Sequence, residues 1–309
     1  MVRPEITEIA TAVFTEHRAL LVGVAYRILG SVADAEDVVQ EAWLRWSKVD
    51  HNTVEQPRAF LITTVSRLAI DRLRQVKAQR ESYLGPWLPE PWLAGQLADK
   101  QADRQAERVE LAGSVELALL VVLETLSPLE RAVFVLREAF DLPFADIAEI
   151  IGREEAAARQ LAKRAREHVA SRRPRFEVDQ TRRRQVTERF MAAATHGDLA
   201  GLTRLLAADV ELVSDGGGKA RSPIKVLAGV DHVARFLGAV TTPHATRLFL
   251  ASIGVDPDTA LDTTIEQVNG APAMVLWAQG RVITIVSLVI VDGAIRTIYL
   301  VANPDKLRA

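Results

Sequence analysis

The chain has 309 residues, enough for two or three domains that each bury a core, and a net charge of −2 argues against a general nucleic-acid coat. It contains no cysteine, which excludes disulfide bonds and thiolate metal sites. The N-terminus lacks the apolar segment of a signal peptide, and no uncharged apolar run approaches the ~20 residues that span a bilayer, so we expect a soluble cytoplasmic protein without membrane contact.

Charge is distributed unevenly along the chain. Residues 58–80 hold six basic residues and one acidic residue, and residues 153–184 hold eleven basic and five acidic residues. Residues 31–41 hold four acidic residues and no basic one, whereas from residue 210 onward nine acidic residues face nine basic ones. Two basic segments, one acidic segment and a neutral remainder indicate binding to DNA together with a protein partner.

The first ~80 residues have the apolar spacing of amphipathic helices. In "VADAEDVVQEAWLRWSKV" (32–49), one face collects apolar residues including Trp46, while Asp34, Asp37 and Glu41 share another face. We expect Trp46 and its neighbour Trp43 to pack in the core, and stacking on DNA bases is the alternative interpretation. A further helix is predicted from Pro57 through "RAFLITTVSRLAIDRLRQVKAQR", because proline favours the first turn.

A linker interrupts this helical pattern at residues 83–93. The stretch "YLGPWLPEPWL" contains three prolines and two tryptophans, so it cannot be helix interior and favours an extended, semi-rigid conformation. A second helical block is predicted from about residue 107 to 170. Within it, Ser127, Pro128 and Glu130 have the spacing of an N-cap, a first-turn proline and a capping box.

A helix-turn-helix is predicted in "DLPFADIAEIIGREEAAARQLAKRARE" (141–167). A short helix over residues 144–151 ends at Gly152, and a second helix is expected from Arg153 onward. Ala148, four positions before the glycine, is small enough to let the two helices cross closely. The second helix presents four long polar side chains that suit a major groove, Arg159, Gln160, Lys163 and Arg164. An ordinary solvated basic face is the alternative interpretation.

The last part of the chain, from about residue 180, has a different character. Two helical stretches are predicted, "QVTERFMAAATHGDLAGLTRLLA" (185–207) and "PIKVLAGVDHVARFLGAV" (223–240). β-rich sequence follows, with Asn269-Gly270 and Asp292-Gly293 between β-branched runs, which is a strong hairpin signal. We therefore expect helices packed on a curved antiparallel sheet.

Three segments in order, "YRILGSVADAEDVVQEAWLRW", "PRAFLITTVSRLAIDRLRQ" and "LETLSPLERAVFVLREAFDLPFADIAEIIG", resemble the bacterial extracytoplasmic-function sigma factors over roughly residues 10–170. The resemblance implies a region 2 helical bundle, a region 4 helix-turn-helix, promoter DNA, and core RNA polymerase as partner through its β′ clamp helices and β flap. The residues implied in core binding are Asp34, Asp37, Gln40 and Glu41. Those implied in −10 recognition are His51, Asn52, Arg58, Arg67, Arg72 and Arg74. Those implied in −35 recognition are Arg159, Gln160, Lys163 and Arg164.

Two positions depart from the family's pattern. Many members have asparagine where this chain has Arg67, and a basic residue is common where it has Leu161 in an alanine-rich recognition helix. Both departures bear on the promoter sequence that is read, and neither bears on the role.

The C-terminal extension resembles the SnoaL-like, NTF2-like cone fold, an α+β domain found in a subgroup of these sigma factors. The resemblance implies a regulator in cis that contacts the linker or the sigma domains. The segments that match that subgroup are Asp215, Gly216, Gly217, Gly218 and Lys219 in one loop and Asn303, Pro304, Asp305, Lys306 and Leu307 near the C-terminus. A phosphate-binding P-loop is the alternative for "SDGGGK", but its spacing is wrong and Ala220 follows the lysine.

Other functions stay open at this point. The protein could be a helix-turn-helix regulator whose cone cavity senses a small ligand, or an enzyme. An enzyme would use acid–base groups from Asp215, Asp231 and His232, with Trp277 and Tyr299 as cavity walls. No motif calls for a cofactor or a metal. The expected domains are region 2 (1–80), a linker (81–106), region 4 (107–173) and the cone domain (180–309).

Overall fold

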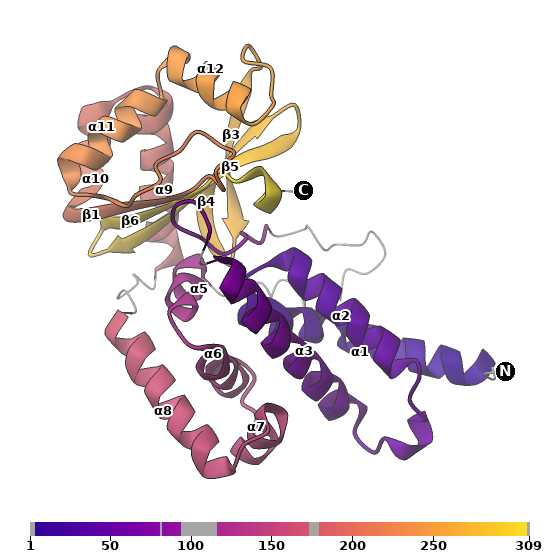
Figure 1. Ribbon diagram of the computed structural model, residues 1–309. Helices are drawn as coiled ribbons and strands as arrows, with labels where there is room; N and C mark the ends of the chain where they lie inside the picture. Colours follow the sequence, from indigo (N-terminus) through magenta and orange to yellow (C-terminus); the bar gives the residue numbers. More distant parts are fainter. Residues whose placement is uncertain (1–3, 81, 94–115, 173–178, 308–309) are drawn as a thin grey trace. The chain divides into compact units, whose positions relative to one another are not determined.

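Figure 1 shows the protein as a computed structural model, in which residues 4–80, 82–93, 116–172 and 179–307 are described. Contacts divide the chain into two compact units. The N-terminal unit comprises, of the described residues, 4–80 and 119–172. The C-terminal unit comprises 82–93, 116–118 and 179–307, so the proline-rich linker packs with the last domain.

The first half of the N-terminal unit is a helical bundle. Its elements are α1 (Pro4–Leu29), α2 (Val32–Trp46), the 3-10 turn η1 (His51–Thr53) and α3 (Pro57–Arg80). Ser31 is the N-cap of α2, because its hydroxyl accepts a hydrogen bond from the Asp34 amide at 3.2 Å. Trp46 is fully buried and donates its indole N–H to the Ala10 carbonyl at 3.0 Å, which confirms its predicted place in the core.

The second half contains the predicted helix-turn-helix. Its elements are α5 (Leu117–Glu124), α6 (Pro128–Phe134), the π-helix η2 (Val135–Ala139), α7 (Phe144–Ile151) and α8 (Glu155–Arg172). The capping box of Ser127 and Glu130 is confirmed at the start of α6. Gly152 is left-handed, with φ of 63°, and lets the amide of Arg153 reach the Ala148 carbonyl at 3.0 Å. Because Arg153 closes this turn, α8 begins two residues later than predicted.

The C-terminal unit is a six-stranded sheet with helices on it, as predicted. Its helices are α9 (Gln180–Thr195), α10 (Leu199–Leu205), α11 (Val230–Val240), α12 (Pro243–Ser252) and the 3-10 turn η3 (Pro304–Lys306). Its strands are β1 (Leu206–Asp215), β2 (Leu227–Ala228), β3 (Leu261–Val268), β4 (Ala271–Ala278), β5 (Arg281–Val291) and β6 (Ala294–Val301), in the order β2-β1-β6-β5-β4-β3. Apolar side chains of α9, α10 and α11 form one core with the sheet face that they cover (Figure 1).

Both predicted hairpins are confirmed, with Asn269-Gly270 joining β3 to β4 and Asp292-Gly293 joining β5 to β6. Other details differ from the prediction. The stretch 185–207 is broken where Asp198 caps α10, and the stretch 223–240 is helical only from Val230. Strand β1 pairs with β6 in parallel, so the sheet is not wholly antiparallel.

None of the described helices is long and apolar enough to cross a membrane.

Candidate functional site

One exposed face of α2 holds three of the four residues expected to bind a protein partner. Asp37, Gln40 and Glu41 are exposed, and Glu41 accepts a hydrogen bond from Arg45 at 2.6 Å. Leu44 continues this face at helical spacing and is 52% exposed. Sequence reasoning missed Leu44, although its i+3, i+4 and i+7 spacing from the three polar residues was visible. These four residues are called the α2 face below.

Asp34 lies elsewhere. Its carboxylate is 15% exposed and accepts hydrogen bonds from Arg72 Nε at 2.8 Å and Nη2 at 2.6 Å. Asp34 was expected to contact polymerase and Arg72 to contact DNA, but in this structure they hold α2 against α3. Both bonds end on the same carboxylate oxygen, Oδ1, and a half-buried, charge-assisted pair of this kind is a packing contact that sequence spacing does not reveal.

The residues expected at the −10 element lie before the start of α3 and along that helix. The His51 ring lies 4.3 Å from the Trp46 ring, and its Nδ1 is buried without a hydrogen-bond partner among the described residues. Asn52 is in η1, and exposed Arg58 borders a cleft of about 790 Å³ that α1 and α3 form with residues 140–150. Arg74 is exposed and pairs with Asp71 at 2.8 Å.

Arg67 contacts the helix-turn-helix. Its Nη2 donates to the Glu149 carbonyl at 2.9 Å and its Nε to the Ile150 carbonyl at 3.3 Å. These carbonyls belong to the last turn of α7, where the helix dipole favours a cation. Arg67 therefore bonds to the end of α7, and the shorter side chain of asparagine could not reach these carbonyls.

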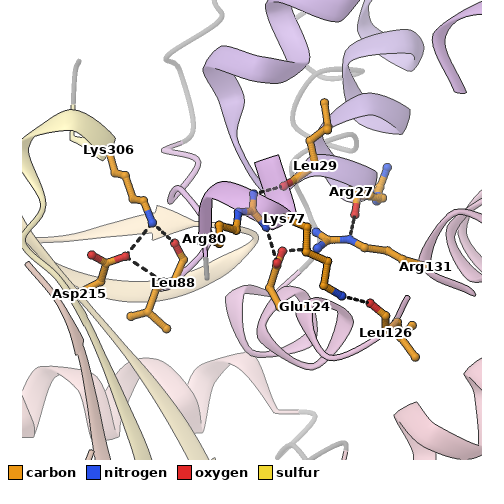
Figure 2. A network of polar contacts seen from close by, with 10 residues as sticks. All are labelled: Arg27, Leu29, Lys77, Arg80, Leu88, Glu124, Leu126, Arg131, Asp215 and Lys306. Carbon is orange, nitrogen blue, oxygen red and sulfur yellow. Dashed lines mark hydrogen bonds and ion pairs between the residues drawn. The ribbon is translucent and has the colours of Figure 1, made fainter. Parts of the chain in front are cut away.

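A second contact between the two halves of the N-terminal unit centres on Glu124, at the end of α5 (Figure 2). Glu124 Oε2 pairs with Arg80 Nη1 at 2.5 Å, and Oε1 pairs with Arg131. Arg131 is 1% exposed. Burial lowers the pKa of Arg80, and the neighbouring Glu124 carboxylate opposes that shift. The three residues are called the Glu124 latch.

Backbone carbonyls complete the bonding around the latch. Arg80 Nη2 donates to the Leu29 carbonyl at 2.9 Å, and Arg131 Nε donates to the Arg27 carbonyl at 3.1 Å. Lys77 Nζ donates to the Leu126 carbonyl at 2.7 Å (Figure 2). Basic side chains of α3 are thus bonded to the ends of α1, α5 and α7.

The four residues expected at the −35 element are all exposed on α8, Arg159, Gln160, Lys163 and Arg164. The opposite face of α8 is buried through Ala158, Ala162 and Ala165. Alanine on that face lets α8 pack closely on α6 and α7, which accounts for the alanine-rich sequence of this helix. The structure therefore brings the predicted reading residues together on one free face.

The linker, residues 82–93, is bound within the C-terminal unit by Asp215. This carboxylate is 1% exposed and lies at the end of β1. It accepts hydrogen bonds from the Tyr83 hydroxyl at 2.5 Å and the Leu88 amide at 2.9 Å. Lys306 Nζ approaches it at 2.6 Å and also donates to the Leu88 carbonyl at 2.5 Å (Figure 2).

The glycine loop and the C-terminal segment meet at the same site. Asn303 donates to the Tyr83 hydroxyl at 2.8 Å, and a Cβ on Gly217, which has φ of 61°, would lie 2.4 Å from the Asn303 side chain. Lys219 pairs with Asp305 at 2.5 Å. Gly217 is therefore needed because two protein segments approach closely here. This contact accounts for the glycine without a bound phosphate.

Aromatic and strand contacts extend this linker site. Lys306 Nζ lies 3.9 Å from the Trp87 ring centroid, a short cation–π distance. Trp92 and Asn269 exchange two hydrogen bonds, and Leu93 forms an antiparallel bridge with Val268. The sequence predicted an aromatic linker, but it did not reveal that Tyr83 and Leu88 bind Asp215 or that Trp92 binds Asn269.

The residues of the enzymatic alternative do not form an acid–base centre. Asp215 is bonded to the linker, whereas Asp231 and His232 are exposed on α11, with His232 Nδ1 at 3.1 Å from the Ala228 carbonyl. Trp277 donates to the Thr264 hydroxyl at 2.9 Å. Burial raises the pKa of Tyr299 to about 12, so its hydroxyl stays protonated at neutral pH.

Comparisons with known proteins agree with this arrangement. The family model of sigma-70 region 2 matches residues 13–79, and that of sigma-70 region 4 matches residues 116–169. The chain is 39% identical to the ECF RNA polymerase sigma factor SigJ of Mycobacterium tuberculosis, over 95% of this chain and 91% of the relative. It is 34% identical to a probable ECF sigma factor, SigI, of the same species, over 97% and 96% of the two chains.

Among solved structures, the crystal structure of SigJ from Mycobacterium tuberculosis is similar with a TM-score of 0.71 and 37% identity, covering 97% of both chains. The similarity therefore includes the C-terminal unit as well as the helical regions. The chain belongs to the extracytoplasmic-function sigma factors, which bind core RNA polymerase and direct transcription from specific promoters.

Proposed function

We propose that the C-terminal unit regulates this sigma factor in cis by holding the polypeptide that connects regions 2 and 4. The −10 and −35 elements lie about 25 base pairs apart, roughly 85 Å at ~3.4 Å per base pair. In this structure Arg67, an expected −10 contact, is 2.9 Å from a carbonyl of the helix-turn-helix expected to read −35. The N-terminal unit must therefore open before both elements are read together.

The C-terminal unit binds residues near both ends of this connecting segment, and this observation supports control by that unit. Residues 81–116 join α3 to α5. Near the start of that segment, Tyr83 and Leu88 are bound to Asp215, and at its end Glu116 pairs with Arg183 of α9 at 2.9 Å. Arg183 is 5% exposed, so this pair lies inside the unit. Release of the linker from Asp215 would give the connecting segment the length that promoter binding requires.

The α2 face is our proposed contact with the β′ clamp helices, and region 4 would lie at the β flap. Asp37 and Glu41 supply negative charge, and Leu44 supplies apolar area beside them. Asp34 is excluded from this contact because Arg72 holds it. Exposed Arg58 and Arg74, with His51 and Asn52, remain the proposed −10 contacts. Because a sigma factor acts on RNA polymerase, we propose that the protein works in the cytoplasm.

The double substitution Asp37→Arg with Glu41→Arg is expected to abolish binding to core polymerase, because it reverses the charge of the α2 face without removing buried contacts. Co-elution of the full chain with core enzyme measures this directly. The control is Asp231→Arg with Asp262→Arg, which makes the same charge change at exposed positions of the C-terminal unit. Equal co-elution of the two double variants would place the polymerase contact elsewhere.

A further inference from the structure

A cluster at the start of the helix-turn-helix surrounds Phe144, the first residue of α7. The guanidinium carbon of Arg137 lies 5.2 Å from the Phe144 ring centroid, and that of Arg159 lies 5.6 Å from it. Both distances are within the range of cation–π attraction. Phe144 is half-buried, so one aromatic ring contacts an arginine of the preceding π-helix and an arginine of the recognition helix.

Each of the two arginines is also held by oxygen atoms. Arg137 Nη1 donates to the Leu142 carbonyl at 3.0 Å and pairs with Asp141 at 3.0 Å. Arg159 Nη2 donates to the carboxylate of Glu155, one turn earlier on α8. Arg159 nevertheless has a side chain that is 63% exposed, and no other described residue accepts a hydrogen bond from its guanidinium. The remaining donors of its planar fork stay available, while the contacts with Glu155 and Phe144 restrict its direction.

An exposed guanidinium that its neighbours orient, as in Arg159, suits a bidentate contact with a base. Arginine donates in bidentate fashion to O6 and N7 of guanine in the major groove, and an arginine that is already oriented loses less rotamer freedom when it binds. Lys163, on the same face, differs in this respect. Its side chain is 75% exposed and its ion pair with Glu167 is 3.9 Å long, so it is a flexible charge suited to phosphate.

We infer that Phe144 and Glu155 are positioning residues that orient Arg159 to read a guanine in the −35 element. The inference rests on the proposed role of α8 as the −35 reader and goes beyond it by assigning one base type to one side chain. It also gives α7 a part in specificity, through a residue that need not touch the base. An ordinary Glu-to-Arg helix pair would stabilise α8 and leave base choice unchanged.

The test uses the full chain with core polymerase and a pool of duplex promoters randomised across the −35 region. Bound DNA is sequenced for wild type, Arg159→Ala, Phe144→Leu, Phe144→Tyr, Glu155→Gln and Lys163→Ala. Arg159→Ala is expected to lower enrichment of guanine at one position by about tenfold or more. Phe144→Leu and Glu155→Gln should lower it at that same position by about two- to five-fold, whereas Phe144→Tyr, which keeps the ring face, should retain it.

Coupling distinguishes positioning from a general structural effect. Phe144→Leu should cause no further loss of guanine preference in the Arg159→Ala background, because the side chain that it orients is absent. Lys163→Ala should weaken binding to all sequences equally and reduce the salt dependence. A uniform loss of affinity in Phe144→Leu, or losses that add fully in the double variant, would overturn the positioning role. Absence of any base preference in wild type would instead overturn the −35 assignment of α8 and the inference with it.

Discussion

Replacing Asp215 by alanine is expected to lower the free energy of unfolding of the C-terminal unit by about 3–5 kcal/mol, the typical cost of leaving one partner of a buried ion pair alone. Lys306 would lose this ion pair, which is 2.6 Å long and lies where its side chain is only 11% exposed. The Tyr83 hydroxyl and the Leu88 amide would lose their acceptor at the same time. The linker is therefore expected to leave the sheet.

Two measurements separate stability from linker release. Chemical unfolding gives the free energy, and limited proteolysis between residues 82 and 93 reports whether the linker is accessible. The matched control is Asp209→Ala, also on β1, because Asp209 pairs with Arg296 at a site where both side chains are more than half exposed. Such a surface pair contributes about 0–1 kcal/mol. If both variants protected the linker equally well, Asp215 would not be the residue that holds it.

Replacing Glu124 by alanine is expected to separate the two halves of the N-terminal unit. Two cations lose their shared counter-ion, and both are buried, with Arg131 1% and Arg80 12% exposed at the side chain. We expect the free energy of unfolding of this unit to fall by about 3–5 kcal/mol. The ion pair of Arg67 with the Glu149 carboxylate of α7 is 3.5 Å long and exposed at both side chains, so it is too weak to compensate.

Distance measurement between spectroscopic labels on α2 and α8 tests this expectation in the full chain, because the chain has no cysteine and two labelling sites can be introduced uniquely. The label distance should increase and broaden in Glu124→Ala. Glu138→Ala is the control, since Glu138 and Arg166 form an exposed pair at 3.6 Å in the same unit. An unchanged distance distribution in Glu124→Ala would show that the latch does not hold the two halves together.

Local signals in the sequence predicted the elements that local chemistry determines. The capping box at Ser127, the left-handed turn at Gly152 and the hairpins at Asn269-Gly270 and Asp292-Gly293 each depend on residues that are adjacent in the chain. The Gln279-Gly280 hairpin was missed because glutamine rarely takes positive φ, although here its φ is 52°.

Features that depend on distant residues could not be predicted in the same way. The parallel pairing of β1 with β6 joins residues some ninety positions apart. Helix α12 was missed because its N-cap, Thr242, is a residue type that is also common in loops. The pairing of Asp34 with Arg72 is a similar case, since each residue alone matched a functional pattern. By contrast, the family resemblance named both the glycine loop and the C-terminal segment as candidate contacts of the linker, and Asp215 and Asn303 do bind linker residue Tyr83.

The central claim, that the C-terminal unit controls the sigma factor through the linker, is tested most directly by locking the linker in place. Leu93 and Val268 form an antiparallel bridge, whose Cα separation of about 4.5–5.5 Å suits a disulfide. Leu93→Cys with Val268→Cys in this cysteine-free chain gives a reversible lock. In reconstituted transcription with core polymerase, we expect the oxidised variant to lose promoter-dependent transcripts and reduction to restore them, while wild type responds to neither condition. Equal transcription from the oxidised and reduced variant would contradict control through the linker.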